Sequence, residues 1–214
     1  MEQDEIVRFL DAIRDHNYGI LFQVTLFTGM RQGEVLGLTW DCVDFASNTI
    51  YVKQQLQKTQ KVGGTYTLAP TKSGRSRTIT VAPTVMELLK MQKARQQQLQ
   101  QQAGPAWENP WNLVFTNDLG GHLCHVTVYK HFKSVVQELG LSEERFHDLR
   151  HSYAVVAIES GDDIKTVQSN LGHATASFTL DVYGHVSQRM KQQSADRMEK
   201  FIQGIHEKQN SIAS

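Results

Sequence analysis

One helix that is apolar on nearly every side constrains the fold of this chain most. Residues 18–28 read YGILFQVTLFT, and Gly29 follows as a helix end. A helix that is apolar all round is stable only when other elements surround it. The chain has 214 residues, 40% of them hydrophobic, which suits one good-sized domain or a larger and a smaller one. We therefore expect a globular fold built around this helix.

Further helices are indicated by apolar residues at helical spacing and by their end signals. The last of them, residues 187–205, is mostly polar with a thin apolar stripe of Met190, Met198, Phe201 and Ile202, which favours docking on a partner. The other expected helices are residues 4–15, a short one near Arg31, 83–102, 125–139, 146–159, 164–172 and a short one from Thr175 to near Tyr183.

Alternating apolar and polar residues, together with turn signals, predict strands between the short helix near Arg31 and the helix at 83–102. We expect a three-stranded antiparallel sheet over about residues 49–81, with Ser73-Gly74 as a tight turn and 77–81 as the returning strand. Residues 113–115 (LVF) are expected to form a short buried strand. The predicted fold class is mainly α with a small antiparallel β-sheet (α+β).

Charge is balanced overall but unevenly distributed. The chain has 22 Lys and Arg and 22 Asp and Glu. Residues 45–86 contain no Asp or Glu and six cations, which are Lys53, Lys58, Lys61, Lys72, Arg75 and Arg77. This stretch fits either a solvated β face or a surface that contacts phosphates.

The two cysteines and the hydropathy exclude several classes. Cys42 and Cys124 do not suggest a disulfide framework, and they suit a reducing cytosol. No CxxC pair indicates a structural zinc site, and no apolar run reaches membrane-spanning length.

Six residues of chemical interest are spaced along the chain. Two arginines suit phosphate or carboxylate oxygens, because a planar guanidinium donates several hydrogen bonds at once. A tyrosine becomes a nucleophile when cations and a base favour loss of its proton, and a lysine or histidine can move protons near neutral pH. Together the set suits phosphoryl transfer to a tyrosine. Its members are Arg31, Lys72, His147, Arg150, His173 and Tyr183.

Taken singly, these residues also have ordinary structural explanations. Arg31 and Glu34, three residues apart, suit a structural ion pair at a helix junction. Lys72 suits a solvated turn lysine. The ordered set is more specific than any of its members.

The motifs TGMRQGEVLGL, TKSGRSRTI, HDLRHSYA, LGH and DVYGH together resemble the catalytic domain of a tyrosine recombinase, of the phage integrase family. The resemblance covers nearly the whole of residues 1–214 and is greatest to integrases of conjugative transposons and of phages of Gram-positive bacteria. It implies the catalytic-domain fold of that family. Such integrases carry DNA-binding domains before the catalytic one, so we expect this chain to be a fragment without them.

The resemblance implies a role for each matching residue. Tyr183 attacks the scissile phosphate and forms a 3′-phosphotyrosyl link, while Arg31 and Arg150 hold the non-bridging oxygens. Glu34 supports Arg31.

The resemblance also implies which residues transfer protons and which make further contacts with the phosphate. Lys72 protonates the leaving 5′ oxygen, His147 assists proton transfer at the tyrosine, and His173 hydrogen-bonds the phosphate. The basic stretch becomes a DNA-contacting surface, with Lys53, Arg75 and Arg77 as its candidates.

The function implied is site-specific recombination that integrates or excises a mobile element or phage. Its partners are double-stranded DNA attachment sites, a homotetramer that exchanges the helix at 187–205, and accessory DNA-bending proteins. The resemblance implies no metal ion, no cofactor and no ATP. It places the protein in the bacterial cytoplasm, at the nucleoid when acting.

Three alternatives remain open from the sequence. A type IB topoisomerase-like enzyme uses the same residues but rejoins the same strand. A metal-dependent hydrolase would use His147 and His151, four residues apart on a helix, with Asp148 as a poorly placed base. A regulatory DNA-binding module would keep the fold without the chemistry.

Overall fold

The computed structural model describes residues 1–60, 64–72, 74–172, 192 and 195–205. Helices dominate the fold, and the expected helices that lie in this part of the chain are confirmed within a few residues. They are α1 (Gln3–Ala12), α2 (Gly19–Thr28), α3 (Gln32–Leu36), α4 (Pro83–Ala103), α5 (His125–Glu138), α6 (Asp148–Glu159) and α7 (Ile164–Leu171). The helix expected from Thr175 to near Tyr183 lies outside the described residues.

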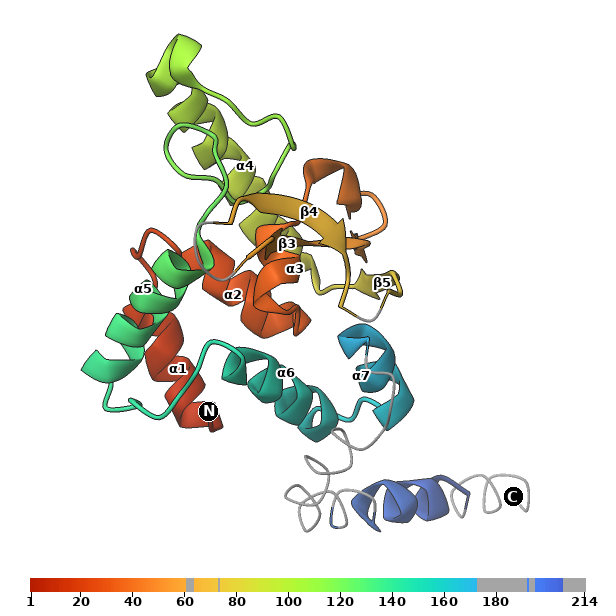
Figure 1. Cartoon of the computed structure of the whole chain (residues 1–214). Helices are drawn as coiled ribbons and strands as arrows, with labels where there is room; N and C mark the ends of the chain where they lie inside the picture. Colours follow the sequence, from red (N-terminus) through yellow and green to blue (C-terminus); the bar gives the residue numbers. More distant parts are fainter. Residues whose placement is uncertain (61–63, 73, 173–191, 193–194, 206–214) are drawn as a thin grey trace.

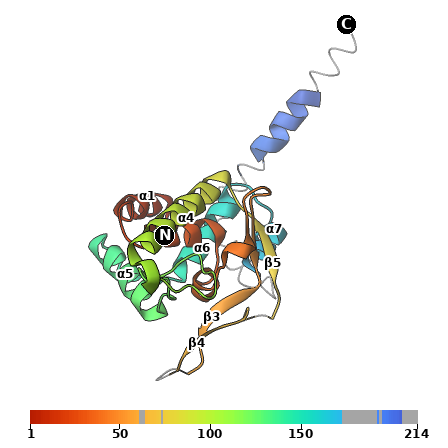
Figure 2. The same cartoon turned by 90° about the horizontal axis from the view of Figure 1, so that it is seen from above.

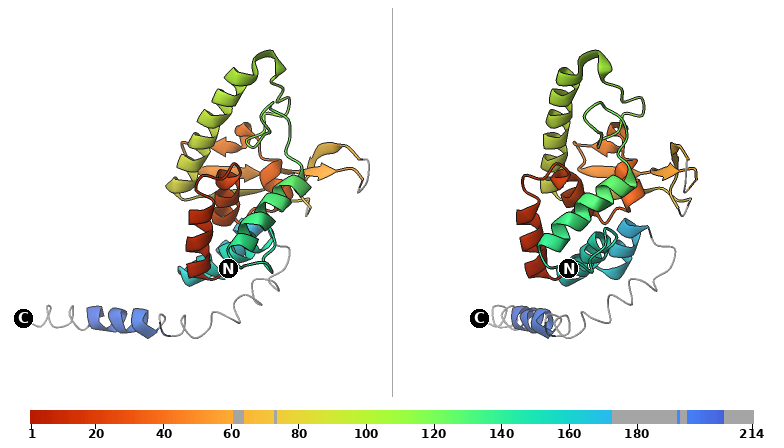
Figure 3. Two further views of the ribbon diagram at one scale, coloured as in Figure 1. Left: turned by 90° about the vertical axis from the view of Figure 1, so that its left-hand side faces the viewer. Right: turned by 60° about the vertical axis from the view of Figure 1, so that its left-hand side comes forward.

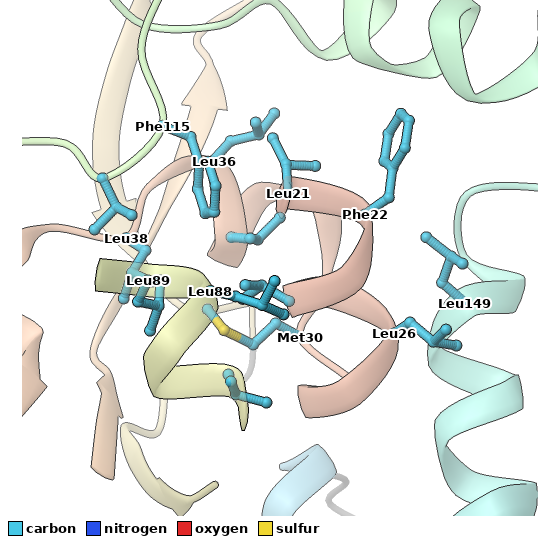
Figure 4. Packing of buried hydrophobic residues seen from close by; sticks show 14 of the residues in the cluster. Leu21, Phe22, Leu26, Met30, Leu36, Leu38, Leu88, Leu89, Phe115 and Leu149 are labelled. Carbon is cyan, nitrogen blue, oxygen red and sulfur yellow. The ribbon is translucent and has the colours of Figure 1, made fainter. Parts of the chain in front are cut away.

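The apolar helix α2 lies at the centre, as its composition predicts. It contacts α3, α4 and α6, which surround it in Figure 1. Leu21, Phe22, Val24 and Leu26 are at most 2% exposed. Figure 4 shows Leu26 of α2 facing Leu149 of α6, with Leu36, Leu88 and Phe115 in the same core. Full burial of each such side chain contributes roughly 1.5–3 kcal/mol, so this core fixes the scaffold on which the site is built.

Five short strands form two sheets, which corrects the predicted single sheet over residues 49–81. The three-stranded sheet has the order β1 (Val43–Asp44), β2 (Thr49–Val52) and β5 (Arg77–Thr80), all antiparallel. A second, two-stranded sheet pairs β3 (Gln54–Lys58) with β4 (Tyr66–Pro70). Figure 2 shows β3 and β4 projecting from the helical body.

A loop at residues 71–76 explains this division. Val52 pairs with Arg77, whereas Gln54 pairs with Pro70, so the described residues between the two ladders, 71–72 and 74–76, fall outside both. The N–H of Gly74 donates to the Thr71 carbonyl at 2.8 Å, and Gly74 has φ +68°. The strands on either side of this hydrogen bond pair with different partners, and Ser73 of the predicted turn lies outside the described residues.

One smaller expectation also differs from the structure. Residues 113–115 are buried, but a single bridge from Leu113 to Thr39 forms there, rather than a strand.

Helices α6 and α7 carry a separate, smaller apolar cluster. It consists of Ala154, Ala157, Ile158, Val167 and Leu171. Figure 3 shows these two helices at one end of the molecule and the far end of α4 at the other. Helix α7 is capped by Asp163, whose carboxylate accepts hydrogen bonds from the N–H groups of Lys165 and Thr166 at 2.9 and 3.0 Å.

The C-terminal part is helical over residues 195–205. Met198, Phe201 and Ile202 are 59%, 65% and 41% exposed, so the described part of the expected apolar stripe faces outward. In the described part of the chain, no helix combines the length and the hydropathy needed to cross a membrane.

Candidate active site: three arginines at the end of α7

Three arginines from separate elements converge on the last residues of α7; we call Arg31, Arg77 and Arg150 the arginine cluster. Each donates to one of three consecutive backbone carbonyls. The bonds run from Arg77 Nε to Asn170 O (2.6 Å), from Arg150 Nη2 to Leu171 O (2.5 Å) and from Arg31 Nη2 to Gly172 O (3.5 Å). The last carbonyls of a helix lack partners within it and carry partial negative charge, so cations are favoured there.

Arg150 is the most buried member of the cluster, with 1% of its surface exposed. It projects from the buried face of α6, and its Nη1 donates to the Gly29 carbonyl at the end of α2 at 2.6 Å. Arg150 therefore joins the ends of α2 and α7. Its Nε has no hydrogen-bond partner among the described residues. Burial, together with the charges of Arg31 and Arg77, lowers the pKa of Arg150 to about 9. The side chain is therefore still charged at neutral pH.

Glu34 is the anion that holds two of these arginines. Its carboxylate is 2.8 Å from Arg31 Nη1 and also accepts the Arg31 backbone N–H at 2.9 Å. Arg77 binds it with two donors, Nη2 at 2.7 Å and Nη1 at 3.1 Å. Burial alone would raise the pKa of Glu34, but the hydrogen bonds and charge of Arg77, with the bonds from Arg31, lower it to about 2. The expected Arg31–Glu34 pair is confirmed.

Two glycines with left-handed backbone allow the close approach of α2, α6 and α7. Gly29 has φ +64°, and a Cβ there would lie 2.6 Å from Cδ1 of Tyr153. Gly172 also has φ +64°, and a Cβ there would lie 2.9 Å from Cδ of Arg77. Both helix ends therefore need glycine for conformation and for space.

His147 immediately precedes α6 and lies at an exposed position. Burial of part of the ring, together with the charges of His151, Arg150 and Arg31, lowers its pKa to about 4, although Asp148 opposes this shift. The rings of His147 and His151 meet edge to face at 5.1 Å. At neutral pH His147 is therefore an uncharged imidazole beside a cationic cluster.

The other expected site residues are distributed as follows. Lys72 is exposed on the loop at 71–76, and Arg75 is exposed on the same loop. Lys53 forms an exposed ion pair with Asp41, with Nζ 2.7 Å from Oδ2. His173 and Tyr183 lie outside the described residues.

Arg77 departs from its expected place on a DNA-contacting surface. Its side chain is 8% exposed and is held by Glu34 and the Asn170 carbonyl. The strand pattern could have indicated this, because Arg77 and Ile79 alternate with exposed residues on β5 and so face inward together. The basic stretch concealed this signal, because we expected its six cations, Arg77 included, to lie together on one surface.

Comparison with known proteins supports the motif-based resemblance. A tyrosine recombinase XerC-like protein of Caldanaerobacter subterraneus subsp. tengcongensis is 29% identical over 204 residues, covering 91% of this chain and 52% of that protein. The ICEBs1 integrase of Bacillus subtilis is 24% identical over 201 residues, covering 93% of this chain and 54% of that protein. This chain thus spans about half the length of these curated relatives.

Solved structures support the fold. The Tn1549 transposon integrase, determined in complex with transposon right end DNA, superposes with a TM-score of 0.74 at 20% identity, over 93% of this chain and 65% of that one. The sequence model of the phage integrase family matches residues 1–190. Since that match covers most of the sequence, the chain belongs to the phage integrase family.

Proposed function

We propose that this chain is the catalytic part of a site-specific DNA recombinase, an integrase that cuts and rejoins DNA strands through a 3′-phosphotyrosyl intermediate. Family membership supports this function, and the residues of the family's motifs are present as Arg31, Lys72, His147, Arg150 and Tyr183. The biological outcome is integration or excision of a mobile element or phage.

One observation carries the proposal: the arginine cluster holds more positive charge than its carboxylate neutralises. Among the described residues, two of the three guanidinium groups bind the carboxylate of Glu34, and the third, that of Arg150, is bound by neutral backbone carbonyls. Their net charge of two suits a bound anion. The buried Nε–H of Arg150 has no partner among the described residues, an arrangement that is costly unless an acceptor is supplied. A phosphodiester offers both the charge and the acceptor oxygens.

The proposed reaction conserves a phosphoester bond at every step. The Oη of Tyr183 attacks the phosphorus, its proton passes to neutral His147, and the bond to the 5′ oxygen breaks as that oxygen takes a proton from Lys72. A 5′-hydroxyl of another strand then attacks the phosphotyrosine, gives its proton to Lys72 and releases Tyr183, which takes back a proton from His147. His173 donates to the phosphate. The exchange of one ester for another needs neither ATP nor a metal ion.

The proposed partners are double-stranded DNA attachment sites and further copies of this chain, acting at the bacterial nucleoid with accessory DNA-bending proteins. The exposed stripe of Met198, Phe201 and Ile202 supports exchange of the C-terminal helix between protomers in a tetramer. These residues stand at positions i, i+3 and i+4, so they share one face of the helix, and such a face can bind in an apolar groove.

A groove of matching character lies between α1, α2 and α6. Ile6, Phe27, Tyr153, Val156 and Ala157 contribute to its lining, and its volume is about 410 Å³. We propose that it receives the exchanged helix. Analytical ultracentrifugation on DNA should show Phe201→Asp reducing the tetramer to smaller complexes; an unchanged tetramer would contradict the exchange.

The covalent step can be tested with nicked duplexes that trap the intermediate by losing the strand needed for rejoining. Because the target sequence is not specified by the site, the substrate is a pool of labelled duplexes with randomised sequence around the nick. The wild-type chain should form a denaturant-resistant protein–DNA adduct. Tyr183→Phe should bind DNA without forming one; an adduct in that variant would contradict the proposal.

Adding a second duplex distinguishes recombination from nicking and closing. A recombinase yields a strand-swapped product that contains label from both duplexes. A topoisomerase-like enzyme relaxes supercoiled DNA but yields no such product.

A further inference from the structure

We propose that Arg77 is a positioning residue of the strand-transfer site, which holds Glu34 so that the guanidinium of Arg31 keeps donors free for the phosphate. This inference rests on the proposed function for its chemical consequence. The contacts themselves are independent of that function, and the resemblance gives Arg77 only as a candidate DNA contact, not as a partner of Glu34.

The first step is the unequal sharing of the Glu34 carboxylate. Arg77 binds both oxygens, with Nη1 to Oε1 at 3.1 Å and Nη2 to Oε2 at 2.7 Å. Arg31 reaches the carboxylate with one side-chain donor, Nη1 to Oε1 at 2.8 Å, and with its backbone N–H to Oε2 at 2.9 Å. The two-pronged pair, which is the strongest geometry for a guanidinium and a carboxylate, therefore belongs to Arg77.

The second step is the consequence for Arg31. Without Arg77, the nearest cation to both Glu34 oxygens would be Arg31, and a two-pronged pair between them would take up two of its donors. With Arg77 in place, Arg31 keeps a single side-chain bond to Glu34 and a long contact of 3.5 Å to the Gly172 carbonyl. The Arg31 side chain is 21% exposed, against 8% for Arg77, so Arg31 is the more accessible of the two to a ligand.

The third step is the position of Arg77 in the chain. It is the first residue of β5, directly after the loop at 71–76 that carries Lys72. Its Nε donates to the Asn170 carbonyl near the end of α7 at 2.6 Å. One side chain thereby links α3, β5 and α7. Small displacements of reacting groups, of about 1 Å, cost roughly 10²-fold in rate, so loosening this link should affect chemistry more than affinity.

Two substitutions and a matched control test the role. Arg77→Met removes the charge and all three donors, and Arg77→Lys keeps the charge but cannot form the two-pronged pair. Arg95→Met is the control, because Arg95 also donates twice, to the carbonyl and side chain of Asn17 at 2.9 and 3.2 Å, but lies on α4 away from the arginine cluster.

Single-turnover adduct formation on saturating nicked duplex should fall about 10²-fold in Arg77→Met. The DNA dissociation constant should stay within about threefold of wild type, since the interaction acts on chemistry rather than on binding. Arg77→Lys should recover part of the rate, and Arg95→Met should match wild type. A dissociation constant that rises with a salt slope about one unit smaller, at unchanged rate, would make Arg77 a DNA contact and overturn the proposal.

A second readout does not depend on activity. In the DNA-free chain, the order parameter of the Arg31 Nε–H measured by NMR should rise in Arg77→Met, because Arg31 takes up the two-pronged pair with Glu34, and stay unchanged in Arg95→Met. An unchanged Arg31 in folded Arg77→Met and Arg77→Lys would overturn the positioning role even if activity were lost. A wild-type chain that forms no adduct while Arg31 becomes more ordered in Arg77→Met would instead reject the proposed function and keep the positioning contact.

Discussion

The centre of the molecule and the end of α7 are held in place by different forces. Around α2, tightly packed apolar side chains such as Phe22 and Leu26 exclude water, and their attraction depends little on pH or on anions. The end of α7 has a smaller apolar cluster, and its last carbonyls are bound by three charged side chains. A phosphate can compete for those same donors. The scaffold is thus insensitive to the ligand, whereas the residues beside the site respond to it.

Truncation in the central core should have the largest effect on stability. The ring of Phe22 packs against those of Phe132 and Phe146, with centroids at 5.9 and 6.0 Å. Phe22→Ala should lower the free energy of unfolding by roughly 3–5 kcal/mol, measured by urea denaturation. Phe201→Ala is the matched control, because Phe201 is 65% exposed and its loss should change stability by less than about 0.5 kcal/mol. Equal effects would contradict the placement of α2 at the centre.

Removal of Arg150 should affect chemistry and the end of α7 together. Arg150→Ala should slow adduct formation by about 10²–10³-fold, because a charge-stabilising donor is lost. Hydrogen exchange should also quicken in α7, since the Leu171 carbonyl loses its donor, while α2 keeps most of its protection. A near-wild-type rate in single turnover would refute the role of Arg150.

Acid should weaken the arginine cluster through Glu34. The pKa of Glu34 is lowered from 4.5 to about 2 in the fold, so the unfolded chain takes up the proton first as pH falls. The stabilisation is therefore complete above pH 4.5 and is lost between 4.5 and about 2. Linkage gives a loss on the order of 3 kcal/mol. Urea titrations across this range should show that dependence in the wild type, and its persistence in Glu34→Gln would assign it to other groups.

The smallest expected effect comes from the glycine at the end of α7. Gly172→Ala forces a side chain into left-handed backbone, which costs about 1–2 kcal/mol, and places a Cβ against Arg77. The melting temperature should fall modestly, with faster hydrogen exchange at the end of α7. Gly140→Ala is the control, because Gly140 has φ +73° but a Cβ there would meet nothing within 4 Å. If both variants lose the same stability, contact with Arg77 contributes nothing measurable.

Local patterns in the sequence predicted the helices well, because each depends on residues three or four apart and on its own end signals. The apolar run of α2 and its end at Gly29 are examples. Strand pairing was predicted less well. The described residues 71–72 and 74–76 lie outside both ladders, and their exclusion depends on which partners β4 and β5 find elsewhere in the sequence.

The candidate site shows the same division. Motifs identified Arg31, Glu34 and Arg150 correctly as neighbours, but not the carbonyls that hold them. Backbone acceptors such as Leu171 O carry no sequence signature, and the contact with Arg150 spans 21 residues. Arg77 was assigned to the surface because a run of cations suggests solvent, whereas the buried acid that pairs with it lies 43 residues away.

The most direct test of the account is to identify the residue that becomes linked to DNA. The adduct trapped on a nicked duplex would be digested with protease and nuclease, and the modified peptide sequenced by mass spectrometry. The account predicts a nucleotide phosphate on Tyr183. A phosphate linked to any other residue, such as Tyr153, would contradict it.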